Sequence, residues 1–111
     1  MMDDRTIDRV AILQLRTKVR MSLTGQWWPT KWDGGSCELV SEALMVEFGW
    51  PVADGCYVTS KGKHLAHWWN VIDGRLLLDA TADQFEDGDN VRLTTVNDAR
   101  YDSGCGCGKD G

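Results

Sequence analysis

The amino-acid sequence predicts an α+β fold in which N-terminal helices pack on a small antiparallel β-sheet. Apolar residues recur at helical spacing in the first half of the chain, whereas short strand patterns fill the second half. Asp73-Gly74 is a strong hairpin turn between two of those strands. We expect one domain over residues 1–111, with a Gly-rich tail at 103–111, because the length suits one domain and no repeat or linker is visible.

Two helices are expected before the strands. The first covers residues 4–23, where an apolar stripe recurs at helical spacing and Asp3 or Asp4 can cap the start. The second begins at Ser36, whose hydroxyl suits the N-cap position, and ends at Gly49. The start of this second helix carries the candidate nucleophile of the chain.

The sheet is expected to contain four strands, and the turn after the second strand sets its register. With a two-residue turn, Ile72 pairs with Arg75, and Asp79 starts on the wrong face of the sheet. With a three-residue loop, Val71 pairs with Arg75, and His67 lies directly opposite Asp79. Periodicity alone leaves both registers open. The predicted strands cover residues 56–59, 64–72, 75–80 and 91–96.

Composition and charge argue against some classes of protein. Hydrophobic residues make up 42% of the 111 residues and charged residues 26%, which is typical of a soluble globular domain. The net charge of −5 argues against nucleic-acid binding and favours neutral or basic substrates. The basic residues of the first helix are expected to form a solvated face. They are Arg5, Arg9, Arg16, Lys18 and Arg20.

The sequence also indicates a cytoplasmic protein without a membrane partner. No apolar run reaches the length of a membrane span, and the N-terminus lacks the pattern of a secretory signal. In the reducing cytosol the cysteines are expected to remain free thiols. The chain has four of them, at Cys37, Cys56, Cys105 and Cys107.

Cys37 is a candidate catalytic nucleophile. A cysteine attacks as its thiolate, which is favoured at a helix N-terminus and beside a histidinium, and Cys37 lies in the first turn of a predicted helix. The chain has two histidines, His64 and His67, and residues three apart in a strand point to opposite faces. Only one of them can therefore face the thiol. A third group must orient the imidazole, and Asp79 on the returning strand is the candidate.

Each of these residues also has a structural alternative. Cys37 can be a buried small hydrophobe, and His67 can be a hydrogen-bonded core histidine. Asp79 can cap the turn that follows it. His64, near the start of its strand, is expected to have no functional role.

A resemblance favours the catalytic interpretation. Three segments resemble motifs of the small papain-like/transglutaminase-like proteins, many of them from bacteria and their phages. The order and spacing of the segments make the match more specific than any one of them. They are Gly35-Ser36-Cys37 with Ser41-Glu42-Ala43-Leu44, His67-Trp68-Trp69 with Asp73-Gly74, and Leu78-Asp79-Ala80-Thr81-Ala82-Asp83-Gln84-Phe85.

The resemblance implies a papain-like α+β fold and a Cys37–His67–Asp79 triad. Cys37 would attack a carbonyl-type carbon, His67 would act first as base and then as acid, and Asp79 would orient His67. The implied activity is amide-bond hydrolysis of a protein or peptide through an acyl-enzyme, as in a peptidase, an amidase or a deamidase. We expect no cofactor and no metal. The backbone N–H of Cys37 would stabilise the oxyanion, and Gln26 is a candidate second donor.

Other functions remain open at this stage. Transglutaminase-type acyl transfer uses the same acyl-enzyme and differs in the nucleophile that resolves it. The fold could also serve as a non-catalytic phage or host interaction module. A third hypothesis is a small metal-binding protein that uses Cys105, Cys107, Cys56 and a histidine. The Trp-rich loop at 26–32 is a candidate for substrate selection.

Overall fold

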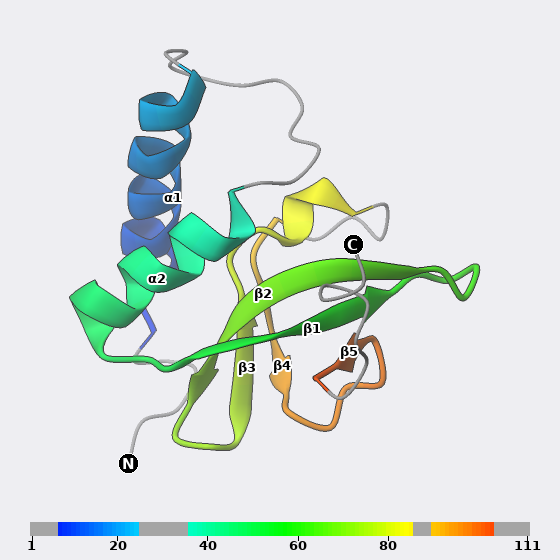
Figure 1. Cartoon of the computed structure of the whole chain (residues 1–111). Helices are drawn as coiled ribbons and strands as arrows, with labels where there is room; N and C mark the ends of the chain where they lie inside the picture. The colour runs from blue at the N-terminus through cyan, green and yellow to red at the C-terminus, as the bar shows by residue number, and fades with distance from the viewer. Residues whose placement is uncertain (1–6, 25–35, 86–89, 104–111) are drawn as a thin grey trace.

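The computed structural model describes residues 7–24, 36–85 and 90–103. In these residues two helices pack on a curled, antiparallel, five-stranded sheet with strand order β4-β3-β2-β1-β5, which confirms the α+β class (Figure 1). No helix in the described ranges combines the length and the apolar character needed to cross a membrane. The elements are α1 (Arg9–Thr24), α2 (Cys37–Phe48), β1 (Val52–Val58), β2 (His64–Ile72), β3 (Leu76–Asp79), the 3-10 helix η2 (Ala82–Gln84), β4 (Arg92–Thr95) and β5 (Tyr101–Asp102).

Helix α1 begins later than predicted. Its first residue is Arg9, because the Oδ1 atom of Asp8 accepts hydrogen bonds from the backbone N–H groups of Val10 (3.0 Å) and Ala11 (3.1 Å). The helix cap is therefore Asp8, and the predicted cap at Asp3 or Asp4 is wrong. Several acidic residues precede the apolar stripe, so the sequence pattern did not identify which of them ends the non-helical segment.

The expectation of a solvated basic face on α1 is wrong for two of its arginines. Arg16 and Arg20 are each only 5% exposed. Arg16 donates to the backbone carbonyls of Ala80 (3.1 Å) and Asn90 (3.0 Å). The long guanidinium side chains reach across from α1 and satisfy acceptors in the segment that follows β3, so their burial does not leave a charge without partners.

Helix α2 agrees with the sequence prediction at both ends. Gly49 has a left-handed φ of 78°, and its N–H donates to the carbonyl of Met45 at 2.8 Å, which ends the helix. The predicted capping role of Ser36 is wrong in detail, because its hydroxyl makes no capping bond and instead accepts from Nε of Arg20 at 3.3 Å. The buried face of α2 consists of Cys37, Val40, Ser41 and Leu44.

The register between β2 and β3 differs from both predicted alternatives. Ile72 pairs with Leu76, because Asp73 and Gly74 both take positive φ (55° and 65°) and Arg75 also stays outside the strand pairing. Continuing this register sets Asp79 opposite Trp69 and diagonal to His67. Residues of equal parity share a face of these paired strands, so the loop brings the Asp79 and His67 side chains to the same side of the sheet.

The remaining strands show where the sequence pattern was incomplete. Strand β1 begins at Val52, earlier than predicted, and pairs along its whole length with β2. Strand β4 lies within the predicted range. Strand β5 was not predicted, because its two residues are too few for a periodic pattern, yet Tyr101 pairs with Tyr57 of β1.

The two faces of the sheet support two hydrophobic clusters. One lies between the helices and the sheet and includes Ile12, Leu44 and Ile72. The other lies on the opposite face and contains Tyr57, Trp69, Leu77 and Tyr101. The candidate site lies where the start of α2 meets this second, aromatic face.

Candidate active site

Cys37 is the first residue of α2 and is 8% exposed. Backbone N–H groups in the first turn of a helix lack intrahelical acceptors, and they make this end of a helix favourable for negative charge. The Cys37 side chain also lies close enough to the imidazole of His67 to help raise the pKa of the ring. The thiol therefore has both features that promote a thiolate, a helix N-terminus and a neighbouring imidazole.

His67 lies in β2 and is 1% exposed. Its Nε2 atom is 2.9 Å from Oδ2 of Asp79. Since Asp79 occupies the Nε2 side of the ring, Nδ1 is the nitrogen that remains for other partners. The structure thus brings Cys37, His67 and Asp79 together in the order that the sequence predicted, whereas His64 lies exposed at the start of β2.

Gln84 fixes the hydrogen-bonding pattern around the imidazole. Its Nε2 atom donates to the carbonyl of Thr81 at 3.1 Å, which sets the orientation of the amide. The same nitrogen is 3.3 Å from Nδ1 of His67. In the neutral ring Nε2–H donates to Asp79, and Nδ1 is an acceptor within reach of the Gln84 amide. This is the tautomer that a general base needs.

Asp79 is fully buried, and both of its carboxylate oxygens have donors. Oδ2 accepts from His67 and, at 2.6 Å, from the hydroxyl of Tyr101. Oδ1 accepts from the backbone N–H of Thr81 at 3.1 Å and from its hydroxyl at 3.3 Å. These donors compensate for the loss of water around the carboxylate and hold it in one orientation.

Behind Asp79 lies a second layer that sequence reasoning missed. Nη1 of the buried Arg92 donates to the hydroxyls of Tyr101 (2.9 Å) and Tyr57 (3.2 Å). Burial, together with the charge of Asp79, raises the pKa of Tyr101 well above its ordinary value, so its hydroxyl stays protonated and donates to Asp79. A buried tyrosine hydroxyl needs a partner, but no local sequence pattern identified Asp79 as that partner.

Aromatic rings enclose the imidazole. Phe85 meets His67 edge-on with ring centroids 4.7 Å apart, and it stacks on Tyr57 at 3.8 Å. Burial alone lowers the pKa of His67, but the hydrogen bonds and charges of Asp79 and Cys37 outweigh it and raise the pKa to about 9. At neutral pH the imidazole of His67 is therefore protonated.

Arg20 connects the two sides of the site. It forms a bidentate ion pair with Asp83 of η2, at 2.6 and 2.9 Å, and its Nε donates to Ser36 at the start of α2. In Figure 1, η2 lies beside the start of α2. A single side chain of α1 thus holds the residue before Cys37 against the segment that carries Gln84.

The cysteine predictions need one correction. Cys56 is disulfide-bonded, to a partner outside the described residues, so the expectation of free thiols is wrong for it. A disulfide sulfur is not a thiolate ligand, and the proposed zinc set therefore loses Cys56. Within the described ranges no cluster of three or more His, Cys, Asp or Glu side chains could hold a metal ion. Cys105, Cys107, Gln26 and loop 26–32 lie outside those ranges.

Comparisons of this chain with family models, with curated proteins and with solved structures find no match. The assignment of the site therefore depends on its own geometry.

Proposed function

We propose that this protein is a cysteine hydrolase of the papain-like/transglutaminase-like kind, which cleaves an amide bond in a protein or peptide. The observation that supports the proposal most directly is the 2.9 Å hydrogen bond between Nε2 of His67 and Asp79, with the Cys37 side chain close enough to the same imidazole to help raise its pKa. The location of the thiol at a helix N-terminus adds to it, because the charge state needed for attack is favoured there.

The proposed reaction passes through an acyl-enzyme. The Cys37 thiolate adds to the carbonyl carbon, and the oxyanion that forms accepts a hydrogen bond from the backbone N–H of Cys37. His67, protonated at Nδ1, then gives its proton to the leaving amine as the C–N bond breaks. Neutral His67 takes a proton from water, whose oxygen attacks the thioester. Collapse of this second intermediate releases the acid and restores the thiolate–histidinium pair.

Asp79 has a supporting role in this scheme. It accepts the Nε2–H hydrogen bond throughout, so the ring keeps Nδ1 directed at sulfur, and its negative charge stabilises the imidazolium form. Acyl transfer to an amine would differ only in the last nucleophile. Replacing water with a small primary amine during turnover would reveal that reaction as an amide product.

The first test is the rate of Cys37 alkylation by iodoacetamide at pH 6, located by peptide mapping. We expect the native protein to react at least about tenfold faster than His67→Ala, because loss of the histidinium removes the thiolate at this pH. His64→Ala is the matched histidine control and should react like the native protein. Equal rates in native and His67→Ala protein would remove the basis for catalysis and favour a non-catalytic binding module.

A second test looks for the acyl-enzyme itself. Incubation with a mixture of peptides, followed by intact-mass measurement, should give an adduct that maps to Cys37 and disappears with hydroxylamine. Cys37→Ala should give none. Hydrolysis that persists in Cys37→Ala would show that another group performs the chemistry.

A further inference from the structure

A pocket of about 450 Å³ lies beside the candidate active site. Gln84 and Phe85 line this pocket, and both also contact the imidazole of His67. A group bound here would therefore lie next to the reactive pair. Its lining also includes Tyr57, Leu65, Lys61 and Lys63.

The pocket combines an apolar wall with a cationic rim. The rings of Tyr57 and Phe85 stack at 3.8 Å with only 9° between their planes, and this pair forms a rigid surface for a hydrocarbon chain. Leu65 adds to the same surface. Lys61 and Lys63 are both exposed at the β1–β2 hairpin tip, residues 59–63, and supply the charge.

Backbone hydrogen bonds hold the hairpin tip in place. Thr59 is the centre of this arrangement: its N–H donates to the carbonyl of Lys63 at 2.9 Å, and its hydroxyl accepts from the N–H of Lys63 at 3.1 Å. Gly62, with φ of 80°, donates to the carbonyl of Thr59 at 2.9 Å. The attachment points of both lysines are thus fixed relative to the pocket.

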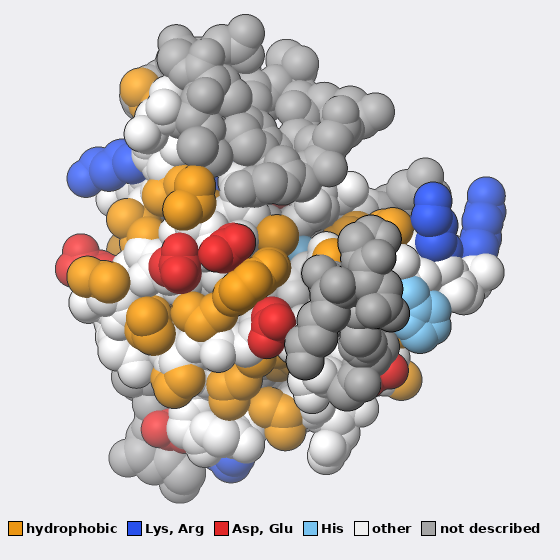
Figure 2. Space-filling model, viewed as in Figure 1, with side chains coloured by type: hydrophobic (Ala, Val, Ile, Leu, Met, Phe, Trp, Pro, Cys, Tyr) orange, Lys and Arg blue, Asp and Glu red, His pale blue; other side chains and the backbone are white. Residues whose placement is uncertain are grey.

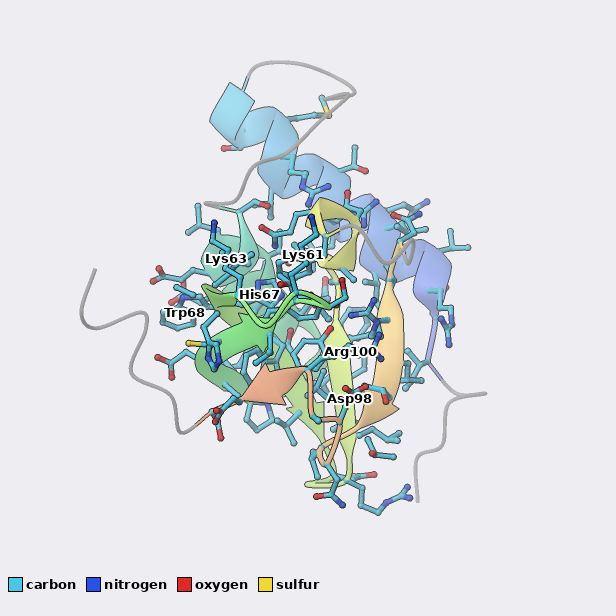
Figure 3. The ribbon with its side chains drawn as sticks, turned by 90° about the vertical axis from the view of Figure 1, so that its right-hand side faces the viewer. Lys61, Lys63, His67, Trp68, Asp98 and Arg100 are labelled. Carbon is cyan, nitrogen blue, oxygen red and sulfur yellow. The ribbon has the colours of Figure 1, made fainter. Side chains whose placement is uncertain are left out.

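The charge at this tip differs from that of the whole chain. The net charge of the protein is −5, yet two lysines meet at one pocket, and neither forms an ion pair with a described residue. Figure 2 shows basic side chains at the right-hand edge of the view, where the hairpin tip lies in Figure 1. Figure 3 turns this side towards the viewer and labels Lys61, Lys63 and His67 on it.

We propose that this pocket binds a carboxylate of a peptide substrate close to the amide bond that Cys37 attacks. Two of its lining residues contact His67, and two others are lysines. This inference rests on the proposed function. Lys61 and Lys63 would select the carboxylate, and the Tyr57–Phe85 surface would pack against the carbon chain that carries it. An acidic substrate is the opposite of what the net charge predicted, because recognition depends on the local field at the cleft.

Two reagents of equal size test the preference. N-iodoacetylglycine carries a carboxylate and N-iodoacetylglycinamide is its neutral counterpart, and both alkylate Cys37. We compare the rate of Cys37 alkylation by the anionic reagent with the rate for the neutral one. At low ionic strength this ratio should be raised in the native protein, and Lys61→Gln/Lys63→Gln should lower it by about threefold to tenfold. Raising the salt to about 0.5 M should lower the ratio of the native protein towards that of the variant.

The matched control is Arg9→Gln/Lys18→Gln, which removes two exposed charges from α1, on the side of the molecule away from the hairpin tip (Figure 1). Its ratio should equal that of the native protein. A ratio that is the same in native and Lys61→Gln/Lys63→Gln protein would overturn the proposed carboxylate site. If the control variant lowered the ratio equally, net charge would explain the preference, and the pocket would have no part in it.

Peptides then identify the source of the carboxylate. One pair compares glutamate with glutamine inside a capped peptide, and another compares a free with an amidated C-terminus, with acyl-enzyme formation at Cys37 as the readout. At least one pair should show a preference that Lys61→Gln/Lys63→Gln removes, and the absence of any such preference would overturn the proposal. The two proposals predict different failures. The proposed function is wrong if a neutral reagent alkylates Cys37 at the same rate in native and His67→Ala protein. The carboxylate site alone is wrong if the rate depends on His67 but the protein shows no preference for the anionic reagent or peptide.

Discussion

The two halves of the candidate site are held in different ways. On the sheet side, the carboxylate of Asp79 accepts from His67, Tyr101 and both donors of Thr81, and Arg92 supports Tyr101 from behind. These groups lie on or next to paired strands, so backbone hydrogen bonds keep their spacing. The base and its orienting group are therefore preorganised by the sheet itself.

On the helix side, the position of Cys37 depends on how α2 docks. Nδ2 of Asn70 donates to the carbonyls of Ser41 (2.9 Å) and Trp50 (3.1 Å), and this ties α2 to β2. At the start of the helix, the Arg20 bridge to Ser36 performs the same function. We infer that variants on the sheet side alter the protonation of the pair, whereas variants on the helix side alter the approach of sulfur to nitrogen.

The largest effect is expected from Asp79→Asn. The amide keeps the shape but loses the charge, so His67 loses the acceptor that fixes its tautomer, and kcat/KM should fall by about 10³- to 10⁴-fold. The buried hydroxyl of Tyr101 and both donors of Thr81 would also lose their charged acceptor, at a cost of about 3 kcal/mol in unfolding free energy. Kinetics with a substrate from the peptide mixture and urea unfolding measure the two effects. Asp73→Asn, in the exposed turn, is the control and should change neither.

The pH dependence of stability tests the charge on His67. Its folded-state pKa of about 9 lies above the unfolded value of 6.5, so protonated His67 stabilises the folded state. The contribution is complete below pH 6.5 and is lost as the pH rises through about 9. On the order of 3 kcal/mol of unfolding free energy should disappear over this range. Urea unfolding of native and His67→Gln protein at about pH 6 and about pH 9.5 measures it, and parallel pH profiles would contradict it.

Arg20→Met is the corresponding test on the helix side. It removes the bidentate pair with Asp83 and the bond to Ser36, which should cost about 2 kcal/mol in unfolding free energy. It should also reduce the effect of His67→Ala on the rate of Cys37 alkylation, because the start of α2 is no longer held. Lys18→Met, on the exposed side of α1, is the matched control. If the His67 dependence were unchanged, Arg20 would have only a structural role.

The smallest effect is expected from Tyr101→Phe. Removing the hydroxyl takes one donor from Asp79 but leaves three, so the loss of stability should be about 1 kcal/mol. With one donor fewer, the carboxylate interacts more strongly with the imidazolium. The pH at which kcat/KM falls on the alkaline side should therefore move upward. A pH–rate profile for both proteins measures the shift, and an unmoved alkaline limb would mean that Tyr101 only fills space.

Local patterns predicted the elements that have strong local signals. Gly49 ends α2 and His64–Ile72 forms β2, as their sequence patterns indicated, and His67 is hydrogen-bonded to Asp79. Contacts between distant segments were not predictable. The burial of Arg16 depends on carbonyls that lie more than sixty residues away, and nothing near it in the sequence signals them.

The second layer of the site illustrates the same limit. Tyr101 reaches Asp79 only because β5 lies against β1 at Gly55, where an added Cβ would clash with the Asp102 carbonyl. The prediction of a free thiol at Cys56 was wrong for a related reason, because Cys56 forms a disulfide with a cysteine from another part of the chain. Disulfides persist mainly in oxidising compartments. The disulfide at Cys56 therefore does not support the expected location in the reducing cytosol.

The three-residue connection 73–75 has a consequence for how this sequence can change. Exposed turns usually tolerate insertions and deletions. Here, if the connection keeps its three-residue geometry, removing or adding a single residue would slip the register by one, and the Asp79 side chain would move to the opposite face from His67. A two-residue change in this case would restore the face but move the strand partner of Asp79 by two positions. The length of a turn outside the site is therefore constrained as tightly as the identity of Asp79 itself.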